Sequence, residues 1–210
     1  MLLVRHAQGS LGTADYDRLS DTGHRQAAIL GDALRRGFPD AEVVRGGLRR
    51  HRQTAERIDG GDIADVDPDL DEYRVDGLLA AALGDADRLG IRRPSEAALQ
   101  DPVAYLDTFL ELFPEVLSAW QAERLSCDVN GPWREFRRRV VEAGSRIERR
   151  LDTASTVVAV TSAGVISTLA AVLLDHGLDW QRRLNVALYN ASVTELRHGE
   201  DGRWTLQRAN

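Results

Sequence analysis

Three short segments carry side chains that bind anions, and each follows an apolar or β-branched run. The first is Arg5-His6, directly after the apolar residues 1–4. The second is the arginine-rich segment 48–56, and the third is 161–164, Thr-Ser-Ala-Gly. Guanidinium groups, hydroxyls and the amides at a helix N-terminus all bind oxyanions such as phosphate. These residue types therefore favour recognition of a small oxyanion.

Hydrophobic patterning places these segments at the ends of predicted strands. Short apolar runs predict strands, at 1–5, 42–44, 63–66 and 156–160. Amphipathic periodicity predicts helices, at 24–36, 49–58, 133–151 and 165–174. Residues 185–197 and 204–207 are expected to form a final hairpin. Strands that alternate with helices are typical of an α/β fold with a mostly parallel sheet, in which ligands bind beyond the carboxyl ends of the strands.

The middle of the chain has a different pattern. From about Gly77 to Gly131 it is helical, with prolines that mark helix starts or breaks. We interpret residues 77–131 as a helical insertion in a single domain that covers residues 1–210. Two roles are open for this insertion: a lid that sets the specificity of the anion site, and a face that forms a homodimer.

Composition excludes several classes of protein. The net charge is −6, so we expect neither nucleic acid nor a membrane surface as a partner, and an anion must be bound by local groups. No apolar run approaches the roughly 18 residues that a membrane-spanning helix needs. Cys127 is the single cysteine, which excludes an intramolecular disulfide. The first residues read as a strand rather than a signal peptide, so we expect a cytoplasmic protein.

The motifs, taken in order, resemble those of the histidine phosphatase superfamily, also called phosphoglycerate mutase-like. They are Leu-Val-Arg-His at 3–6, Leu-Ser-Asp-Thr-Gly-His-Arg-Gln-Ala at 19–27, Leu-Arg-Arg-His-Arg-Gln-Thr-Ala-Glu at 48–56 and Leu-Asp-Glu at 70–72. Arg-His alone is a weak signal, whereas four motifs in this order are specific. The resemblance spans most of the chain and implies a three-layer α/β/α sandwich.

The resemblance also implies a phosphomonoester hydrolase that acts through a phosphohistidine. His6 would be the nucleophile, and Arg5 and Arg50 would bind the equatorial oxygens of the phosphoryl group. Glu72 would protonate the leaving oxygen and then activate water, with Asp71 as the alternative carboxylate. No metal or other cofactor is expected, because the arginines supply positive charge. The expected ligand is a small phosphorylated metabolite or inorganic phosphate.

The chain departs from the family pattern after the late strand. The family has Ser/Thr-His-Gly-Gly there, and its histidine is the second catalytic imidazole; this chain has Ser162 in that position. Loss of one donor to a developing anion costs about 2.7 to 4 kcal/mol, on the order of a hundred- to thousandfold in rate. We therefore expect a slow phosphatase. The alternative is a phosphate-binding or phosphorylated-ligand-binding protein of the same fold whose catalysis has decayed or been redirected.

Ser162 and the remaining histidines also have structural interpretations. Ser162 is expected to bind phosphate through its hydroxyl or to cap the helix that follows it, and the two roles are compatible. The other histidines are expected at the surface or as helix caps: His24, His51, His176 and His198. None of these four enters the expected mechanism.

Overall fold

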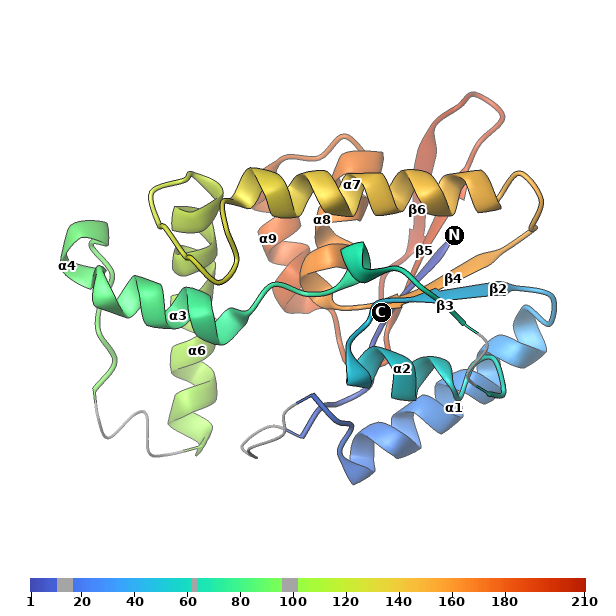
Figure 1. Cartoon of the computed structure of the whole chain (residues 1–210), viewed down its shortest axis with the longest axis horizontal. Helices are drawn as coiled ribbons and strands as arrows, with labels where there is room; N and C mark the ends of the chain where they lie inside the picture. Colours follow the sequence, from blue (N-terminus) through green and yellow to red (C-terminus); the bar gives the residue numbers. More distant parts are fainter. Residues whose placement is uncertain (11–16, 62–63, 96–101) are drawn as a thin grey trace. The chain divides into compact units, whose positions relative to one another are not determined.

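The computed structural model describes residues 1–10, 17–61, 64–95 and 102–210 (Figure 1). These residues form two compact units, one made of 1–72 with 139–210 and the other of 73–138. Residue 63 of the predicted strand 63–66 and residues 96–101 of the predicted insertion lie outside the described residues. The fold of the first unit determines where the candidate site lies.

The described part of the first unit contains one six-stranded sheet with the order β3-β2-β4-β1-β5-β6. Its strands are β1 (Leu2–Arg5), β2 (Glu42–Arg45), β3 (Asp65–Val66), β4 (Val157–Thr161), β5 (Val193–His198) and β6 (Trp204–Arg208). The pairs β1–β4, β2–β4 and β2–β3 are parallel, while β1–β5 and β5–β6 are antiparallel. The prediction of a mostly parallel sheet is therefore confirmed.

Helices cover both faces of this sheet, as Figure 1 shows. On one face lie α1 (Asp21–Gly37) and α2 (Arg49–Ala55), and on the other lie α8 (Ala163–Leu173) and the part of α7 (Trp133–Arg150) that belongs to this unit. Apolar side chains of α1, of α2 and of the turn after α2 pack on alternate residues of the central strands: Leu2, Val4, Leu30, Leu34, Ala55, Ile58, Val158 and Val160. The predicted three-layer α/β/α arrangement is confirmed.

The predicted start of the final hairpin is wrong. Residues 185–187 end a helix, α9 (Leu178–Ala187), and the first hairpin strand, β5, begins only at Val193. Its partner β6 agrees with the predicted strand 204–207. A short stretch in which apolar and polar residues alternate does not distinguish the last turn of an amphipathic helix from a strand. Tertiary packing decides here, because Asn185 is buried on α9.

The second unit is helical, as predicted for most of residues 77–131. It contains α3 (Val75–Gly84), α4 (Ala86–Leu89), α6 (Pro102–Gln121) and the first residues of α7. Aromatic rings form its centre: Trp120 lies 5.2 Å from Tyr73, 5.1 Å from Trp133 and 5.7 Å from Phe136, measured between ring centroids. Among the described residues, no helix combines the length and apolar composition needed to cross a membrane.

The contact between α1 and the turn that follows α2 makes a stability prediction possible. An added Cβ at Gly31 would lie 1.9 Å from the backbone oxygen of Arg57, which cannot move aside like a flexible side chain. We expect Gly31→Ala to lower the free energy of unfolding by about 1–3 kcal/mol, as overpacking does. Gly37 has nothing within 4 Å of its added Cβ, so Gly37→Ala is the matched control. Urea unfolding measures both, and equal effects would contradict the prediction.

Candidate active site

The three anion-binding segments meet at one edge of the sheet. Strand β4 lies between β1 and β2 and runs parallel to both, so their carboxyl ends point the same way. The backbone amide of His6 donates to the Thr161 carbonyl at 2.8 Å, and the amide of Gly46 donates to the Val160 carbonyl at 3.0 Å. Residues 5–6, 46–50 and 161–164 are thus neighbours, as the sequence predicts.

His6 is buried in a fixed orientation. Its Nδ1 lies 2.7 Å from the Ala7 carbonyl oxygen, and its Nε2 lies 3.1 Å from Nε of Arg50. Because a carbonyl accepts and a guanidinium donates, we assign the proton to Nδ1 and the lone pair to Nε2. Burial, followed by the charge of Arg50, lowers the pKa of His6 well below its usual value. His6 is therefore a neutral imidazole, which is the nucleophilic form.

Two arginines stand beside this imidazole. Arg50 is buried on α2 and donates from NH1 to the Asp17 carboxylate at 2.7 Å as well as from Nε to His6. Arg5 ends β1 and donates to the Leu188 carbonyl, and its charge also lowers the pKa of His6. The structure therefore brings His6 and Arg50 into direct contact and places Arg5 at the same strand end.

The spacing within segment 48–56 explains how α2 is attached. Thr54 Oγ1 accepts from the Ala7 amide at 3.1 Å and donates to the Arg50 carbonyl at 2.8 Å. The side chain of Gln53 accepts from the Leu19 amide at 2.8 Å. Residues three and four apart lie on one side of a helix, so Thr54 fixes the turn that presents Arg50. The Gln-Thr pair thus positions the arginine next to the residues that follow β1.

The acidic stretch before residue 72 is anchored rather than simply solvated. Arg146 on α7 pairs with Asp67 at 2.8 Å and with Asp69 at 2.6 Å. Arg139, also on α7, donates to the backbone carbonyls of Asp69 and Asp71, each at 2.7 Å. These contacts hold the segment that ends at Glu72.

The two candidate carboxylates have different partners. Oε2 of Glu72 accepts from the Gly164 amide in the first turn of α8 at 2.8 Å. Oδ1 of Asp71 accepts from the amides of Gly47 and Leu48, at 2.6 and 3.2 Å. Burial alone would raise the pKa of Asp71, but the neighbouring His51 and these amides outweigh it and hold the pKa below its usual value. Asp71 is therefore an ionised acceptor.

Ser162 is the N-cap residue of α8, but its hydroxyl makes no capping hydrogen bond. The hydroxyl instead lies 2.7 Å from Nε2 of His51. The side chain of His51 is fully buried, so the expectation that His51 lies at the surface or caps a helix is wrong. His51 shares a helical face with Thr54 and Ala55, also buried, and this i, i+3, i+4 spacing is the signal that could have predicted its burial.

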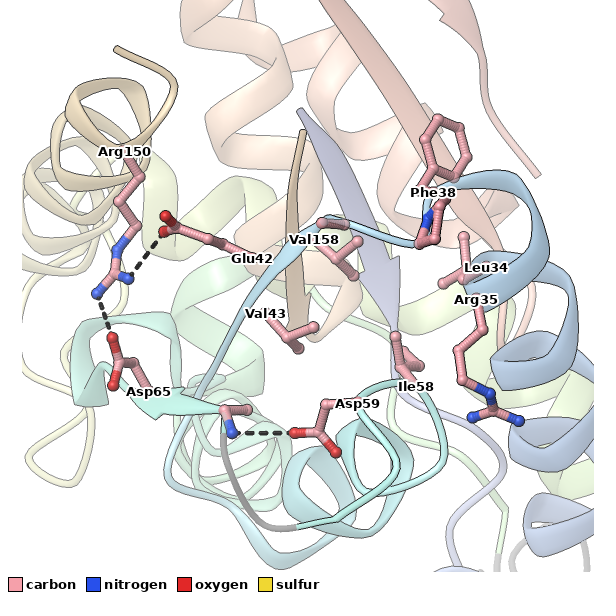
Figure 2. A pocket seen from close by; sticks show the side chains of 13 residues that line it. Leu34, Arg35, Phe38, Glu42, Val43, Ile58, Asp59, Asp65, Arg150 and Val158 are labelled. Carbon is pink, nitrogen blue, oxygen red and sulfur yellow. Dashed lines mark hydrogen bonds and ion pairs between the residues drawn. The ribbon is translucent and has the colours of Figure 1, made fainter. Parts of the chain in front are cut away.

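A cavity of about 530 Å³ in the first unit contains none of the candidate site residues (Figure 2). Its apolar lining comes from Leu34, Phe38, Val43, Ile58 and Val158. At its side, Arg150 pairs with Asp65 at 2.9 Å and Glu42 at 3.4 Å. Because Glu42 and Val158 lie near the beginnings of β2 and β4, this cavity is at the opposite ends of these strands from His6.

Comparisons with known proteins agree with this geometry. The family model for the histidine phosphatase superfamily (branch 1) matches residues 1–81 and 105–210. A search of curated proteins found no match. Among solved structures, the fold is similar to that of the alpha-ribazole phosphatase from Shigella flexneri, with a TM-score of 0.66 at 16% identity, covering 100% of this chain and 95% of the other.

Two further structures share the fold. One is a mycobacterial glucosyl-3-phosphoglycerate phosphatase complexed with VO3, with a TM-score of 0.62 at 21% identity, covering 100% of this chain and 98% of the other. The other is a mutant phosphoserine phosphatase from Entamoeba histolytica in complex with phosphoserine, with a TM-score of 0.64 at 14% identity, covering 100% and 95%. Since the family model matches most of its residues, the chain belongs to the histidine phosphatase superfamily and is an enzyme of the histidine phosphatase type.

Proposed function

We propose that the protein is a metal-independent phosphomonoester hydrolase that acts on a small phosphorylated metabolite through a phosphohistidine at His6. The observation that carries this proposal is the neutral His6 imidazole, whose Nε2 lone pair faces the Arg50 guanidinium. A nucleophile and a cation in direct contact can attack phosphorus and hold the charge on its oxygens together. The hydroxyl of Ser162 stands where the family has an imidazole, so turnover is slow.

In the first step, Nε2 of His6 attacks phosphorus in line with the leaving oxygen, and the phosphorus–oxygen bond opposite breaks. The Ala7 carbonyl accepts from Nδ1–H and stabilises the positive charge that forms on the ring. Arg5 and Arg50 hold the equatorial oxygens, and Glu72 gives a proton to the leaving oxygen. In the second step, Glu72 takes a proton from water, which attacks the phosphohistidine and releases phosphate.

The contacts favour Glu72 over Asp71 as the acid. Asp71 already accepts two backbone amides, and its pKa is held below the usual value, so it is a poor proton donor. Glu72 contacts the amide of Gly164, two residues from Ser162. Glu72 therefore stands beside the edge where the phosphoryl group would bind.

The proposal extends to the ligand and the compartment. Two arginines beside one imidazole suit a phosphate monoester or inorganic phosphate, while the net charge of −6 does not favour nucleic acid. Cys127 is free and buried, and a chain with one such cysteine has no need of an oxidising compartment, which supports a place in the cytoplasm. A homodimer stays a prediction.

The test is the fate of the phosphoenzyme in Glu72→Gln. With p-nitrophenyl phosphate the leaving group needs no proton, so phosphorylation of His6 proceeds, whereas its hydrolysis loses the general base and slows by about a hundred- to ten-thousandfold. We expect an acid-labile phosphoenzyme to accumulate in this variant in the presence of EDTA. Rapid-quench mass spectrometry measures the phosphorylated fraction and locates it at His6.

The matched control is Glu56→Gln, because Glu56 is the C-cap residue of α2 and pairs with Arg52 at 2.6 Å. That variant is expected to turn over like the unmodified protein and to accumulate no phosphoenzyme. If the unmodified protein is stabilised by phosphate against thermal unfolding but hydrolyses no phosphomonoester, the hydrolase proposal is wrong and the ligand-binding alternative holds.

A further inference from the structure

Ser162 and His51 form a buried pair that the proposed mechanism does not use. The first amides of a helix usually receive an N-cap side chain, but here Gly164 bonds to Glu72 and the Ser162 hydroxyl points to His51. Ser162 is 2% exposed, and the side chain of His51 is not exposed at all. The buried hydroxyl of Ser162 therefore bonds to the His51 imidazole and not to an amide of α8.

The His51 ring of this pair also lies near the Asp71 carboxylate and next to the proposed nucleophile, His6. Nδ1 of His51 lies 3.7 Å from Oδ1 of Asp71, the range of an ion pair rather than of a hydrogen bond. The ring centroids of His51 and His6 are 5.6 Å apart. An added Cβ at Gly46 would lie 2.3 Å from Nδ1 of His51 and 2.7 Å from Oδ1 of Asp71, so only glycine leaves room for this contact. His51 thus lies between Asp71 and Ser162, and its ring adjoins that of His6.

The charge on His51 depends on what surrounds it. Burial lowers the pKa of His51 most strongly and the charge of Arg50 lowers it further, while Asp71 and Asp17 act in the opposite direction. The neighbouring His6 ring is neutral. In the absence of a ligand these effects leave His51 neutral. A dianion bound beside His6 adds negative charge and favours the protonated form of His51.

Building on the proposed function, we propose that His51 is a positioning residue that takes up a proton when a tetrahedral dianion binds and thereby makes the Ser162 hydroxyl a hydrogen-bond donor to a phosphoryl oxygen. The proton comes from solvent, and no covalent bond forms or breaks. In neutral His51 the proton lies on Nδ1, on the side of the Asp71 carboxylate, so Nε2 accepts the hydrogen bond from the Ser162 hydroxyl. Protonated His51 keeps Nδ1–H toward Asp71 and donates from Nε2 to Oγ of Ser162, which leaves the hydroxyl hydrogen for the anion. Together, His51 and Ser162 supply a cationic donor that serine alone lacks.

Binding of tungstate tests this without any turnover, because tungstate is a tetrahedral dianion that does not titrate near neutral pH. Calorimetry in buffers of different ionisation enthalpy counts the protons bound with it. We expect the unmodified protein to take up close to one proton and to bind tungstate more tightly as the pH falls. In His51→Gln the uptake should disappear and the affinity should fall by about tenfold to a hundredfold, the value of a charge-assisted hydrogen bond. His24→Gln, a half-buried histidine outside the site, is the control and should bind like the unmodified protein.

Ser162→Ala provides a second variant that keeps the imidazole. Since His51 acts through this hydroxyl, we expect Ser162→Ala to lower the affinity as much as His51→Gln and the double variant to lose no more than either. Additive losses, proton uptake that persists in His51→Gln, or no binding of tungstate to the unmodified protein would overturn the proposal.

Hydrolysis separates this inference from the proposed function. If His6→Ala is inactive while His51→Gln hydrolyses and binds like the unmodified protein, the inference fails and the proposed function stands. If His6→Ala keeps its activity, the proposed function fails, and proton uptake with tungstate still decides the role of His51.

Discussion

His6→Ala is expected to form no phosphoenzyme and to hydrolyse p-nitrophenyl phosphate at the background rate. Removal of a covalent nucleophile costs on the order of 10⁶-fold in kcat, because the remaining groups can bind the substrate but cannot form the intermediate. The two arginines stay in place, so tungstate should still bind. Steady-state hydrolysis and mass spectrometry of the quenched protein measure the two losses.

Two controls separate loss of chemistry from loss of fold. His6 is buried and bonds to Ala7 and Arg50, so truncation leaves a small polar cavity, and a thermal melt shows whether the variant is folded at the assay temperature. His176→Ala removes an exposed imidazole and should leave turnover unchanged. Turnover in His6→Ala above one hundredth of that of the unmodified protein would remove His6 from the mechanism.

The sequence predicts the polar ends of the strands better than the contacts between them. Arg5-His6 follows an apolar run and Thr161-Ser162 follows a β-branched run, so local patterning alone indicates that both end strands. Once the sheet is parallel, its geometry brings these ends together, which is why the contact between His6 and Arg50 agrees with expectation. Periodicity and the parallel sheet thus account for the position of the edge.

The hydrogen bond between His51 and Ser162, in contrast, could not be predicted from local sequence patterns. The two residues are 111 positions apart, and their contact depends on the side of α2 that faces β4 and on the space left by Gly46. No local propensity specifies a pairing over that separation. A histidine in an arginine-rich segment looks solvated, and only the burial of Thr54 and Ala55 on the same face indicates otherwise. The sequence therefore predicts where the candidate residues meet but not the hydrogen bond between His51 and Ser162.

Arg50→Ala tests how the site combines binding with control of the nucleophile. In the proposed mechanism the guanidinium holds phosphoryl oxygens, and an arginine in that role contributes about 10³- to 10⁵-fold in kcat. The same charge lowers the pKa of His6. In the proposed mechanism His6 acts as the neutral imidazole, so activity is lost as the pH falls through this pKa. Without Arg50 the pKa rises toward its ordinary value, and the acid limb of kcat/KM should move to higher pH.

The two effects of Arg50 can be separated from a general loss of positive charge. Arg52 lies on the same helix, is half exposed and pairs with Glu56, so Arg52→Ala removes an equal charge away from His6. We expect Arg52→Ala to keep both the rate and the pH profile. A uniform loss of rate in Arg50→Ala with an unmoved acid limb would mean that this guanidinium binds the phosphoryl group without setting the protonation of His6. A moved limb with an unchanged rate at high pH would mean the reverse. Only a loss of rate together with a shifted acid limb agrees with both proposed roles of Arg50. In these roles its guanidinium contacts His6 in the free enzyme and binds the phosphoryl oxygens once the substrate is bound.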